Sequence, residues 1–186
     1  RLESDGFRRN TFLGRDDTNV RSETTLRGKL RLGLDDGWQI DLAAMHVDLD
    51  NGYDVFTPDN SLTTLSDRPG RDAQRSSGGS AVVSGDLGPA RLASTRAMAD
   101  SDIDYSFDGD WGNDPYWGEF APYDYYTSFA RQRRKLSEDL RLISGATPAD
   151  DGFGWVAGLY ALHLEEDGLQ RDEFAGQALR APLSSN

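Results

Sequence analysis

The sequence predicts an all-β fold in which antiparallel strands run up and down along one sheet. Three observations predict it: apolar and charged residues alternate over long stretches, helical periodicity is scarce, and turn-forming residues separate the stretches. The clearest stretch is LRGKLRLGLDDGWQIDLAAMHVDL at 26–49, which breaks at LDDG and resumes in the same rhythm. A period of two places alternate side chains on opposite faces, so each stretch is expected to be a strand.

This pattern predicts about seven strands, each as long as the roughly 9–11 residues of a tilted membrane-crossing strand or somewhat longer. They lie at 2–12, 21–33, 38–50, 73–84, 90–103, 128–144 and 153–166. The stretch 131–145 also fits a helix, but polar residues recur at every second position from Arg131 to Arg141, which favours a strand. The facing of 73–84 and of 153–166 stays open, because the first is weakly patterned and the second is apolar on both faces.

The links between these strands alternate in length. LDDG at 34–37, GDLGP at 85–89 and GATPADDG at 145–152 are short, whereas 51–72 and 104–126 are long. Short turns at one end and long loops at the other are typical of up-and-down transmembrane β-barrels of the bacterial outer membrane. In such a barrel the leucines of 26–32 face lipid, the basic residues between them face a water-filled lumen, and Trp38 lies at the membrane interface.

Composition narrows the classes of protein. The chain has 186 residues, with 37% hydrophobic, 28% charged, 10% aromatic and 20 glycines, which predicts a folded domain rather than a disordered chain. The formal charge of -12 makes nucleic acid a poor partner. The lack of cysteine excludes disulfides, thiolate metal sites and cysteine nucleophiles. No run approaches the roughly 20 apolar residues of a membrane helix.

Five segments carry a resemblance to a known family. They are SDGFRRNTFLGRDDTN (4–19), ETTLRGKLRL (23–32), NGYDVFTPDNSLTTLSDRPGRDAQ (51–74), ADSDIDYSFDGDW (99–111) and LSEDLRLISG with FGWVAGLYALHLEED (136–167). In order and spacing they resemble the β-barrel half of TonB-dependent outer-membrane receptors of the iron-complex, or siderophore, type. The resemblance spans nearly the whole chain, although no single segment is diagnostic alone.

The resemblance implies a barrel of about 22 strands closed by a plug domain. It implies TonB-energised uptake of a ferric siderophore or similar nutrient across the Gram-negative outer membrane. The TonB complex, acting through the plug, would be a partner, and lipid and lipopolysaccharide would surround the barrel. The sequence departs from the family, since it has no plug, no TonB box, about seven strands and no terminal aromatic residue. Residues 1–186 are therefore expected to form a slice of the barrel, with the plug and the remaining strands absent.

The long loop 104–126 is the candidate ligand-binding segment. It holds nine of the chain's 19 aromatic residues, six acidic residues and no basic one. Aromatic side chains offer much contact area at small entropic cost, so this loop would suit a flat or catecholate-like ligand, such as a ferric chelate. The candidate ligand-binding residues are Tyr105, Phe107, Trp111, Tyr116, Trp117 and Tyr123. The alternative is that the loop packs on itself or joins an aromatic girdle at the interface, for which Tyr123, Tyr125 and Tyr126 are the best placed.

Basic residues at alternate positions form a second candidate site on the lumenal side. The set consists of Arg27, Lys29, Arg31, Arg131, Arg133 and Lys135. Such residues would guide an anionic chelate down the lumen, or be neutralised by carboxylates of the plug or by Asp139. Arg134 points the other way, with Gln132, and is a candidate contact for lipopolysaccharide phosphate.

No metal, cofactor or catalytic site is expected. Aspartates at 100–114 suggest calcium, but Tyr105 stands where an EF-hand loop needs glycine and no Glu closes the site, so a solvated acidic loop is favoured. Of the two histidines, His46 and His163, neither has a companion motif, and the Asp pairs at 35–36 and 150–151 lie in turns. The chain is therefore expected not to be an enzyme.

The sequence is compatible with two functions. The first is a segment of an outer-membrane transporter that takes up an iron chelate or another nutrient. The second is a soluble or surface-attached β-sandwich that packs the leucines of 26–32 inside and binds a glycan or protein through the loop 104–126. The two differ in what covers the leucines: lipid in the first and a second sheet in the second.

Overall fold

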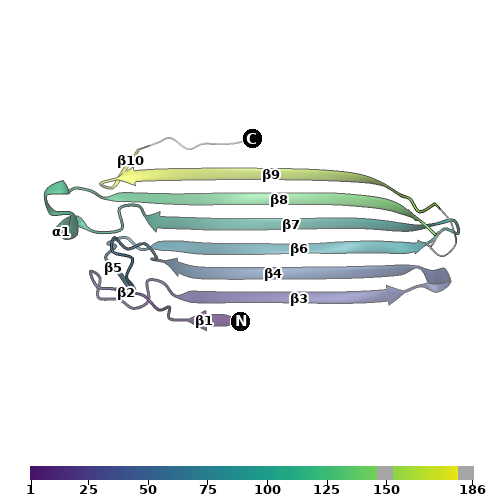
Figure 1. Cartoon of the computed structure of the whole chain (residues 1–186), viewed down its shortest axis with the longest axis horizontal. Helices are drawn as coiled ribbons and strands as arrows, with labels where there is room; N and C mark the ends of the chain where they lie inside the picture. Colours follow the sequence, from purple (N-terminus) through teal and green to yellow (C-terminus); the bar gives the residue numbers. More distant parts are fainter. Residues whose placement is uncertain (146–152, 180–186) are drawn as a thin grey trace.

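The structure, a computed structural model, describes residues 1–145 and 153–179. Its main element is an eight-stranded sheet with the order β1-β3-β4-β6-β7-β8-β9-β10, drawn in Figure 1. The strands are β1 (Leu2–Ser4), β3 (Arg21–Gly33), β4 (Gln39–Tyr53), β6 (Gly70–Asp86), β7 (Ala90–Asp108), β8 (Tyr125–Ser144), β9 (Val156–Phe174) and β10 (Gln177–Ala178). A second sheet pairs β2 (Arg9–Asn10) in parallel with β5 (Thr63–Thr64). The helices are short: η1 (Asp35–Gly37), α1 (Asp114–Trp117) and η2 (Gly118–Phe120).

Every pair of neighbouring strands in the main sheet is antiparallel, so the predicted up-and-down all-β architecture is confirmed. Over the described residues the sheet is open rather than closed, with β1 and β10 at its two edges (Figure 1). No helix in this part of the chain is long and apolar enough to span a membrane.

Strand boundaries match the prediction best where alternation is strict. The expected strand 21–33 is β3, residue for residue. The expected strand 2–12 is wrong, because Gly6 adopts a φ of +84° and leaves only 2–4 and 9–10 in strands. At the long-loop end β7 continues to Asp108 and β8 begins at Tyr125, so the loop there is 109–124 rather than 104–126. Of the expected turn 145–152, residues 146–152 lie outside the described residues, as does the Asp150–Asp151 pair.

The strand register divides the side chains into two faces. Residues that pair across neighbouring strands point to the same face, and one such row consists of Leu30, Leu42, Ala81, Arg96, Glu138 and Ala161. We call the face of this row face A. Because side chains alternate along a strand, face A carries the even residues of β3, β4, β7 and β8 and the odd residues of β6 and β9. Face B carries the remaining strand residues. This register settles the facing that the sequence left open for 73–84 and for 156–166. It also places the predicted leucines on face A and both sets of predicted basic residues on face B.

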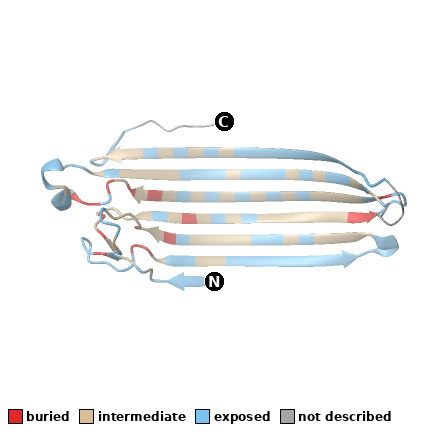
Figure 2. Cartoon of the chain, in the orientation of Figure 1, coloured by how far each residue is buried: buried red, intermediate tan, exposed pale blue. Residues whose placement is uncertain are grey.

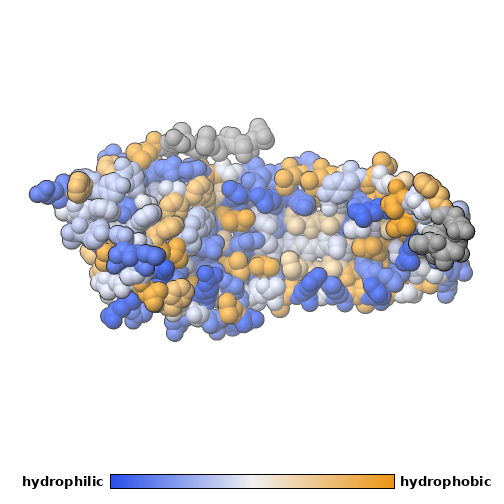
Figure 3. Space-filling model, viewed as in Figure 1, coloured by the Kyte–Doolittle hydropathy of each residue, from blue (hydrophilic) through white to orange (hydrophobic). Residues whose placement is uncertain are grey.

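The sheet has no hydrophobic core of its own. Ala73 and Ala90 are the only buried hydrophobic residues in the described part of the chain. Leu26 is 63% exposed and Leu159 is 76% exposed. Figure 2 shows the middle of the strands exposed or half-buried, and Figure 3 shows hydrophobic residues at the surface along the length of the visible face. The sheet is therefore a single layer whose apolar side chains are not covered by any described segment.

Each half of face A has its own character. In the half near the short turns it is mainly apolar, and it also contains the exposed ion pair of Arg96 with Glu138 at 3.1 Å. Its largest exposed apolar members are Leu26, Leu30, Leu32, Leu42, Met98, Leu136, Leu140 and Leu159. In the half near the long loops it is mainly charged, with Asp48, Asp50, Arg71, Arg75, Asp100, Asp102, Asp104, Arg134, Glu165, Asp167 and Arg171. We call these regions the apolar half and the charged half of face A.

Trp38 lies at the turn end of the apolar half. A Cβ atom on Gly85 would come within 2.2 Å of Cδ2 of Trp38, so the indole ring packs directly on the Gly85 backbone. Only glycine leaves room for this contact at position 85. A Cβ atom on Gly28, also in the apolar half, would meet nothing within 4 Å.

We predict that Gly85→Ala destabilises the protein whereas Gly28→Ala does not. The added methyl group at position 85 must displace the Trp38 ring, and overpacking of this kind costs about 1–3 kcal/mol. Urea unfolding of the full-length protein followed by tryptophan fluorescence measures the difference. Equal midpoints for the two variants would show that the Trp38–Gly85 contact contributes nothing to stability.

Candidate ligand-binding site at the loop end

A buried polar cluster holds the loops at the end of the sheet where the long loops lie. Asn10, Asp54, Thr64 and Ser66 are almost fully buried there. The Asn10 side-chain amide donates to Asp54 Oδ2 at 3.0 Å, while the hydroxyls of Thr64 and Ser66 donate to the two Asp54 oxygens at 2.7 Å each. We call these four residues the polar cluster. It joins β2 to the end of β4 and to β5, and Asn10 is 44 residues from Asp54 in the sequence.

Six aromatic rings lie together on or beside face B, next to this cluster. Tyr53 packs edge to face on Tyr105 at 4.8 Å between ring centroids, and Phe56 stacks on Trp111 at 5.4 Å. The other contacts are Tyr53–Phe56, Phe56–Phe107, Tyr105–Phe107 and Tyr105–Phe129, at 5.8–6.0 Å. We call these six residues the face-B aromatic cluster. Edge-to-face and offset pairs of this kind hold the rings in fixed positions relative to one another.

A second row of rings follows the 109–124 loop. It runs from Tyr116 through Trp117, Tyr123 and Tyr125 to Phe174, with centroid distances of 4.8–5.2 Å. The Trp117 indole also donates to Asp110 Oδ1 at 3.2 Å, which fixes the row to the end of β7. We call this set the loop aromatic row, and it shares no ring contact with the face-B aromatic cluster among the described residues.

The six predicted ligand-binding residues are therefore divided between two groups. Tyr105, Phe107 and Trp111 belong to the face-B aromatic cluster, and the first two lie in β7 rather than in a loop. The other three, Tyr116, Trp117 and Tyr123, belong to the loop aromatic row. Ligand binding by either group stays a prediction.

Three members of the face-B aromatic cluster were missed by the sequence analysis. Tyr53 is the last residue of β4, Phe56 lies in the long loop that follows it, and Phe129 lies in β8. The order of the strands could have predicted them, because in an up-and-down sheet both long loops lie at the same end. Tyr53 is an odd residue of β4, and the odd residues of this strand lie on face B.

The predicted lumenal basic residues share face B, but they differ in their partners. Arg131 and Arg133 both pair with Glu166 of β9, at 3.3 and 2.5 Å, and Arg31 pairs with Asp41 at 2.6 Å. Within the described residues, no carboxylate lies within 4.0 Å of the remaining three: Arg27, Lys29 and Lys135. Half of the set is therefore paired with carboxylates of the sheet itself, whereas Asp139, the partner named in the alternative, pairs with Arg141. The chelate-guiding role stays a prediction.

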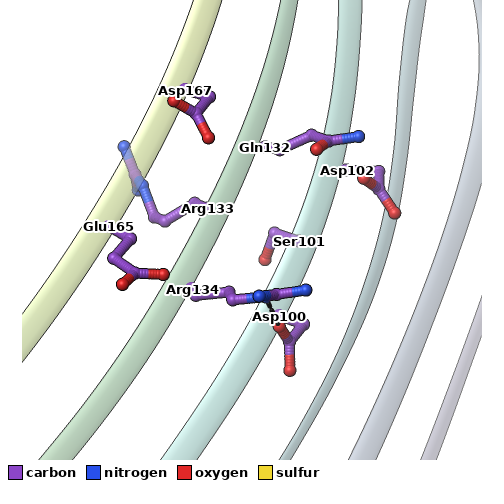
Figure 4. A pocket seen from close by; sticks show the side chains of 8 residues that line it. All are labelled: Asp100, Ser101, Asp102, Gln132, Arg133, Arg134, Glu165 and Asp167. Carbon is purple, nitrogen blue, oxygen red and sulfur yellow. Dashed lines mark hydrogen bonds and ion pairs between the residues drawn. The ribbon is translucent and has the colours of Figure 1, made fainter. Parts of the chain in front are cut away.

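The charged half of face A contains a hollow of about 360 Å³ between β7, β8 and β9. Figure 4 shows Arg134 reaching Asp100, whose Oδ1 atom lies 3.2 Å from Nε of Arg134, with Gln132, Asp102, Glu165 and Asp167 around them. Arg134 points away from Arg133, as the alternation predicted. Because Arg134 is already paired with Asp100, an anion such as lipid phosphate would have to compete with that carboxylate.

The acidic residues at 100–114 are not all solvated, which corrects the favoured expectation. Asp100, Asp102 and Asp104 are exposed on face A, but Asp108 and Asp110 are buried. In the described part of the chain no three acidic, histidine or cysteine side chains are grouped in a way that could hold a metal ion.

The two histidines lie on face A and bind neighbouring polar groups. His46 Nδ1 is 2.8 Å from the Ser77 hydroxyl, and His163 Nε2 is 3.0 Å from Glu165. The His46 partner lies on the neighbouring strand β6, and the His163 partner lies two residues further along β9. Neither pair includes the nucleophile, base and orienting group that a catalytic triad needs.

We predict that Asp54→Ala loosens the loop end without unfolding the sheet. The substitution leaves the buried hydroxyl donors of Thr64 and Ser66 without their acceptor, at about 1–3 kcal/mol for each unpaired group. The Asn10 amide loses one bond but keeps its bonds to Ser66. Hydrogen exchange of the full-length protein should become faster at residues 8–13 and 62–67 but not in the middle of β6 and β7. Asp5→Ala, at an exposed position, is the control, and equal exchange in the two variants would contradict the role of the polar cluster.

Comparisons of the chain with protein-family models, with curated proteins and with solved structures each returned no match.

Proposed function

We propose that this sheet is part of the wall of an outer-membrane β-barrel that takes up a nutrient, of the TonB-dependent receptor class. In this proposal the apolar half of face A faces lipid, and face B faces the lumen. The long loops lie outside the cell and the short turns face the periplasm. Further strands continue the sheet beyond β3 and β9, because an open edge in hydrocarbon would leave backbone groups unpaired at several kcal/mol each.

The observation that carries the proposal is the exposure of the leucines on face A. A water-soluble sheet buries one face against another layer, yet no described segment covers Leu26, Leu30, Leu140 or Leu159. Among the described residues the only other sheet, β2 with β5, belongs to the loop end. The described residues thus do not supply the second layer that a β-sandwich requires. Lipid can cover the apolar side chains of a single sheet without a second layer of protein.

The dimensions of the apolar half support the proposal. On β8 it extends from Leu136 to Ser144, with Glu138 paired to Arg96 inside it, and at about 3.3 Å per residue this is about 26 Å of strand. Tilted by about 40°, such a length covers about 20 Å, which is most of an apolar band about 25 Å tall. The charged half of each strand then extends beyond the outer leaflet and carries the long loops above the membrane.

The nutrient would meet the aromatic residues at the loop end. The face-B aromatic cluster lies on the lumenal side and the loop aromatic row lies above it, so both are placed to contact a ligand that enters from outside. A ferric siderophore or another flat, partly aromatic chelate is the class of ligand that the resemblance and the aromatic content favour. TonB would act through a plug domain that this sheet does not contain.

We predict that Leu140→Arg prevents assembly in the outer membrane whereas Ser137→Arg does not. Leu140 is on face A and would place a charge in lipid, which costs about 2–4 kcal/mol at the bilayer midplane. Ser137, three residues earlier on β8, is on face B and would place the same charge in the lumen. The measurement is the amount of full-length protein in the outer-membrane fraction of Gram-negative cells, by heat-modifiable mobility and protease resistance.

Two results would contradict this proposal. One is equal assembly of the two arginine variants, which would mean that Leu140 does not face lipid. The other is recovery of the wild-type full-length protein in the soluble fraction, which would favour the β-sandwich.

We further predict that Tyr105→Ala and Phe129→Ala reduce nutrient uptake. Loss of one ring removes an aromatic pair worth about 0.5–1.5 kcal/mol in addition to its contact area, so about a tenfold loss of apparent affinity is expected. The assay is uptake of a panel of ferric catecholate and ferric hydroxamate complexes by iron-limited cells. Phe120→Ala is the control, because Phe120 is 76% exposed and belongs to neither aromatic group. Unchanged uptake in both test variants would exclude the cluster as the ligand contact.

A further inference from the structure

Three carboxylates lie near enough to affect one another's charge where the 54–69 loop contacts the 109–124 loop at the end of β7. Asp108 is 6% exposed and Asp110 is 4% exposed, and Asp67 is half-buried beside them. Within the described residues none of the three lies within 4.0 Å of a basic side chain. The nearby Arg68 is engaged elsewhere, 2.8 Å from Glu173 and 3.8 Å from Asp124, with its guanidinium over the Tyr126 ring. Figure 2 shows buried residues at this end of β7, next to α1.

The oxygens of these carboxylates are not equally satisfied. Asp110 accepts from the backbone N–H of Gly112 and of Tyr125, at 2.9 and 2.8 Å, and from the Trp117 indole. Asp108 accepts through Oδ1 from the backbone N–H of Asp110 and Trp111, at 3.2 Å each. Its other oxygen, Oδ2, is buried without a hydrogen-bond partner, as is Asp67 Oδ1. Both oxygens of Asp110 thus accept hydrogen bonds, whereas Asp108 has one buried oxygen without a partner.

Burial, reinforced by the negative charge of Asp110, raises the pKa of Asp108 to about 8. The pKa of Asp67 is also raised, by burial first and then by the charges of Asp124 and Asp110. A cation would satisfy the same oxygens, but the described residues contain no group of three side chains that could hold a metal ion. A proton on Asp108 would instead remove its buried charge, and the Asp110 side chain is the neighbouring group that would accept its hydrogen bond.

We propose that Asp108 carries a proton at neutral pH and that this proton keeps the two long loops joined. The loops are linked at the same place by two hydrogen bonds, from Asp67 N–H to Gly112 O at 3.1 Å and from the Asn113 side chain to Leu65 O at 2.6 Å. Ionisation of Asp108 would put a second full negative charge beside Asp110 in a site with no paired cation. Repulsion would then separate the 54–69 loop from the 109–124 loop and disturb Trp111 and Trp117.

The direction of the pH dependence follows from the raised pKa. With the loops joined Asp108 titrates near 8, and with the loops apart it titrates near its ordinary value of 3.8. Between these values only the joined state holds the proton, so the joined state loses stability as the pH rises and no further stability is lost above about 8. Inside the window the ratio of joined to open states falls by up to about tenfold per pH unit.

Hydrogen exchange of the full-length protein, corrected for the intrinsic rate at each pH, tests the proposal. Amides at 65–67 and 109–117 should lose at least about tenfold in protection between pH 6 and pH 8, while the middle of β7 stays unchanged. Asp108→Asn should keep protection at both pH values, because the amide is neutral and of the same shape. Asp114→Asn, at an exposed position in the same loop, should behave as the wild type.

Infrared spectroscopy provides a second readout that does not depend on a variant's folding. The wild type should show the C=O band of a protonated carboxyl group at pH 6 that disappears with a midpoint near 8. Absence of that band at pH 6, or protection of the wild-type loops that does not change with pH, would overturn the proposal. Protection at pH 8 that is restored by millimolar Ca²⁺ and removed by EDTA would overturn it in favour of a cation. The proposal goes beyond the proposed transport function and stands or falls independently of it.

Discussion

The ladder of backbone hydrogen bonds between long antiparallel strands is the interaction on which the rest of this structure depends. From β3 to β9 each strand pairs with its neighbour along most of its length, and no second layer adds apolar packing over the described residues. In an ordinary domain, burial of apolar surface supplies most of the favourable free energy of folding. Over the described residues the sheet supplies little of that contribution, because Ala73 and Ala90 are its buried hydrophobic residues. In the proposed barrel, lipid on face A would supply it.

The loop end follows a different principle, because polar groups are buried there rather than apolar ones. Asn10, Thr64 and Ser66 are nearly inaccessible to solvent, and each bonds to the Asp54 carboxylate. A fully satisfied polar network specifies one arrangement strongly, since any other arrangement leaves buried groups unpaired. Hydrogen bonds of this network and contacts between rings therefore act together to position the loops at this end. The rings supply the contact surface of the candidate ligand site.

The sequence predicted those features that are determined by the residue pattern within a single strand. Alternation over 21–33 fixed the limits of β3 and the separation of its leucines from its basic residues. Features that depend on pairing between strands were not readable in this way. β7 reaches Asp108 because its partner strands continue that far, and β2 pairs in parallel with β5 across more than 50 residues of chain. Short parallel bridges have no periodicity to reveal them.

The candidate site shows the same division between local and non-local information. The aromatic density of 104–126 identified Tyr105, Phe107 and Trp111, but their neighbours Tyr53, Phe56 and Phe129 follow from the register of β4, β7 and β8. Density alone also merged two ring groups that the structure separates. Whether a residue joins the face-B aromatic cluster is decided by strand parity, which requires knowledge of the partner strand.

The aspartates of the segment 100–110 show why charge and spacing alone do not determine chemistry. Asp100, Asp102, Asp104, Asp108 and Asp110 recur at even positions, and the total charge of the chain gives no reason to distinguish them. The first three lie where both faces of the sheet are open, so water solvates their charges. The last two lie where the sheet ends beneath two loops, so the same carboxylate loses its solvent and must find hydrogen-bond donors or a proton. The position of the loops, and not the acidic sequence, therefore turns part of a solvated charged stripe into a titratable contact between loops.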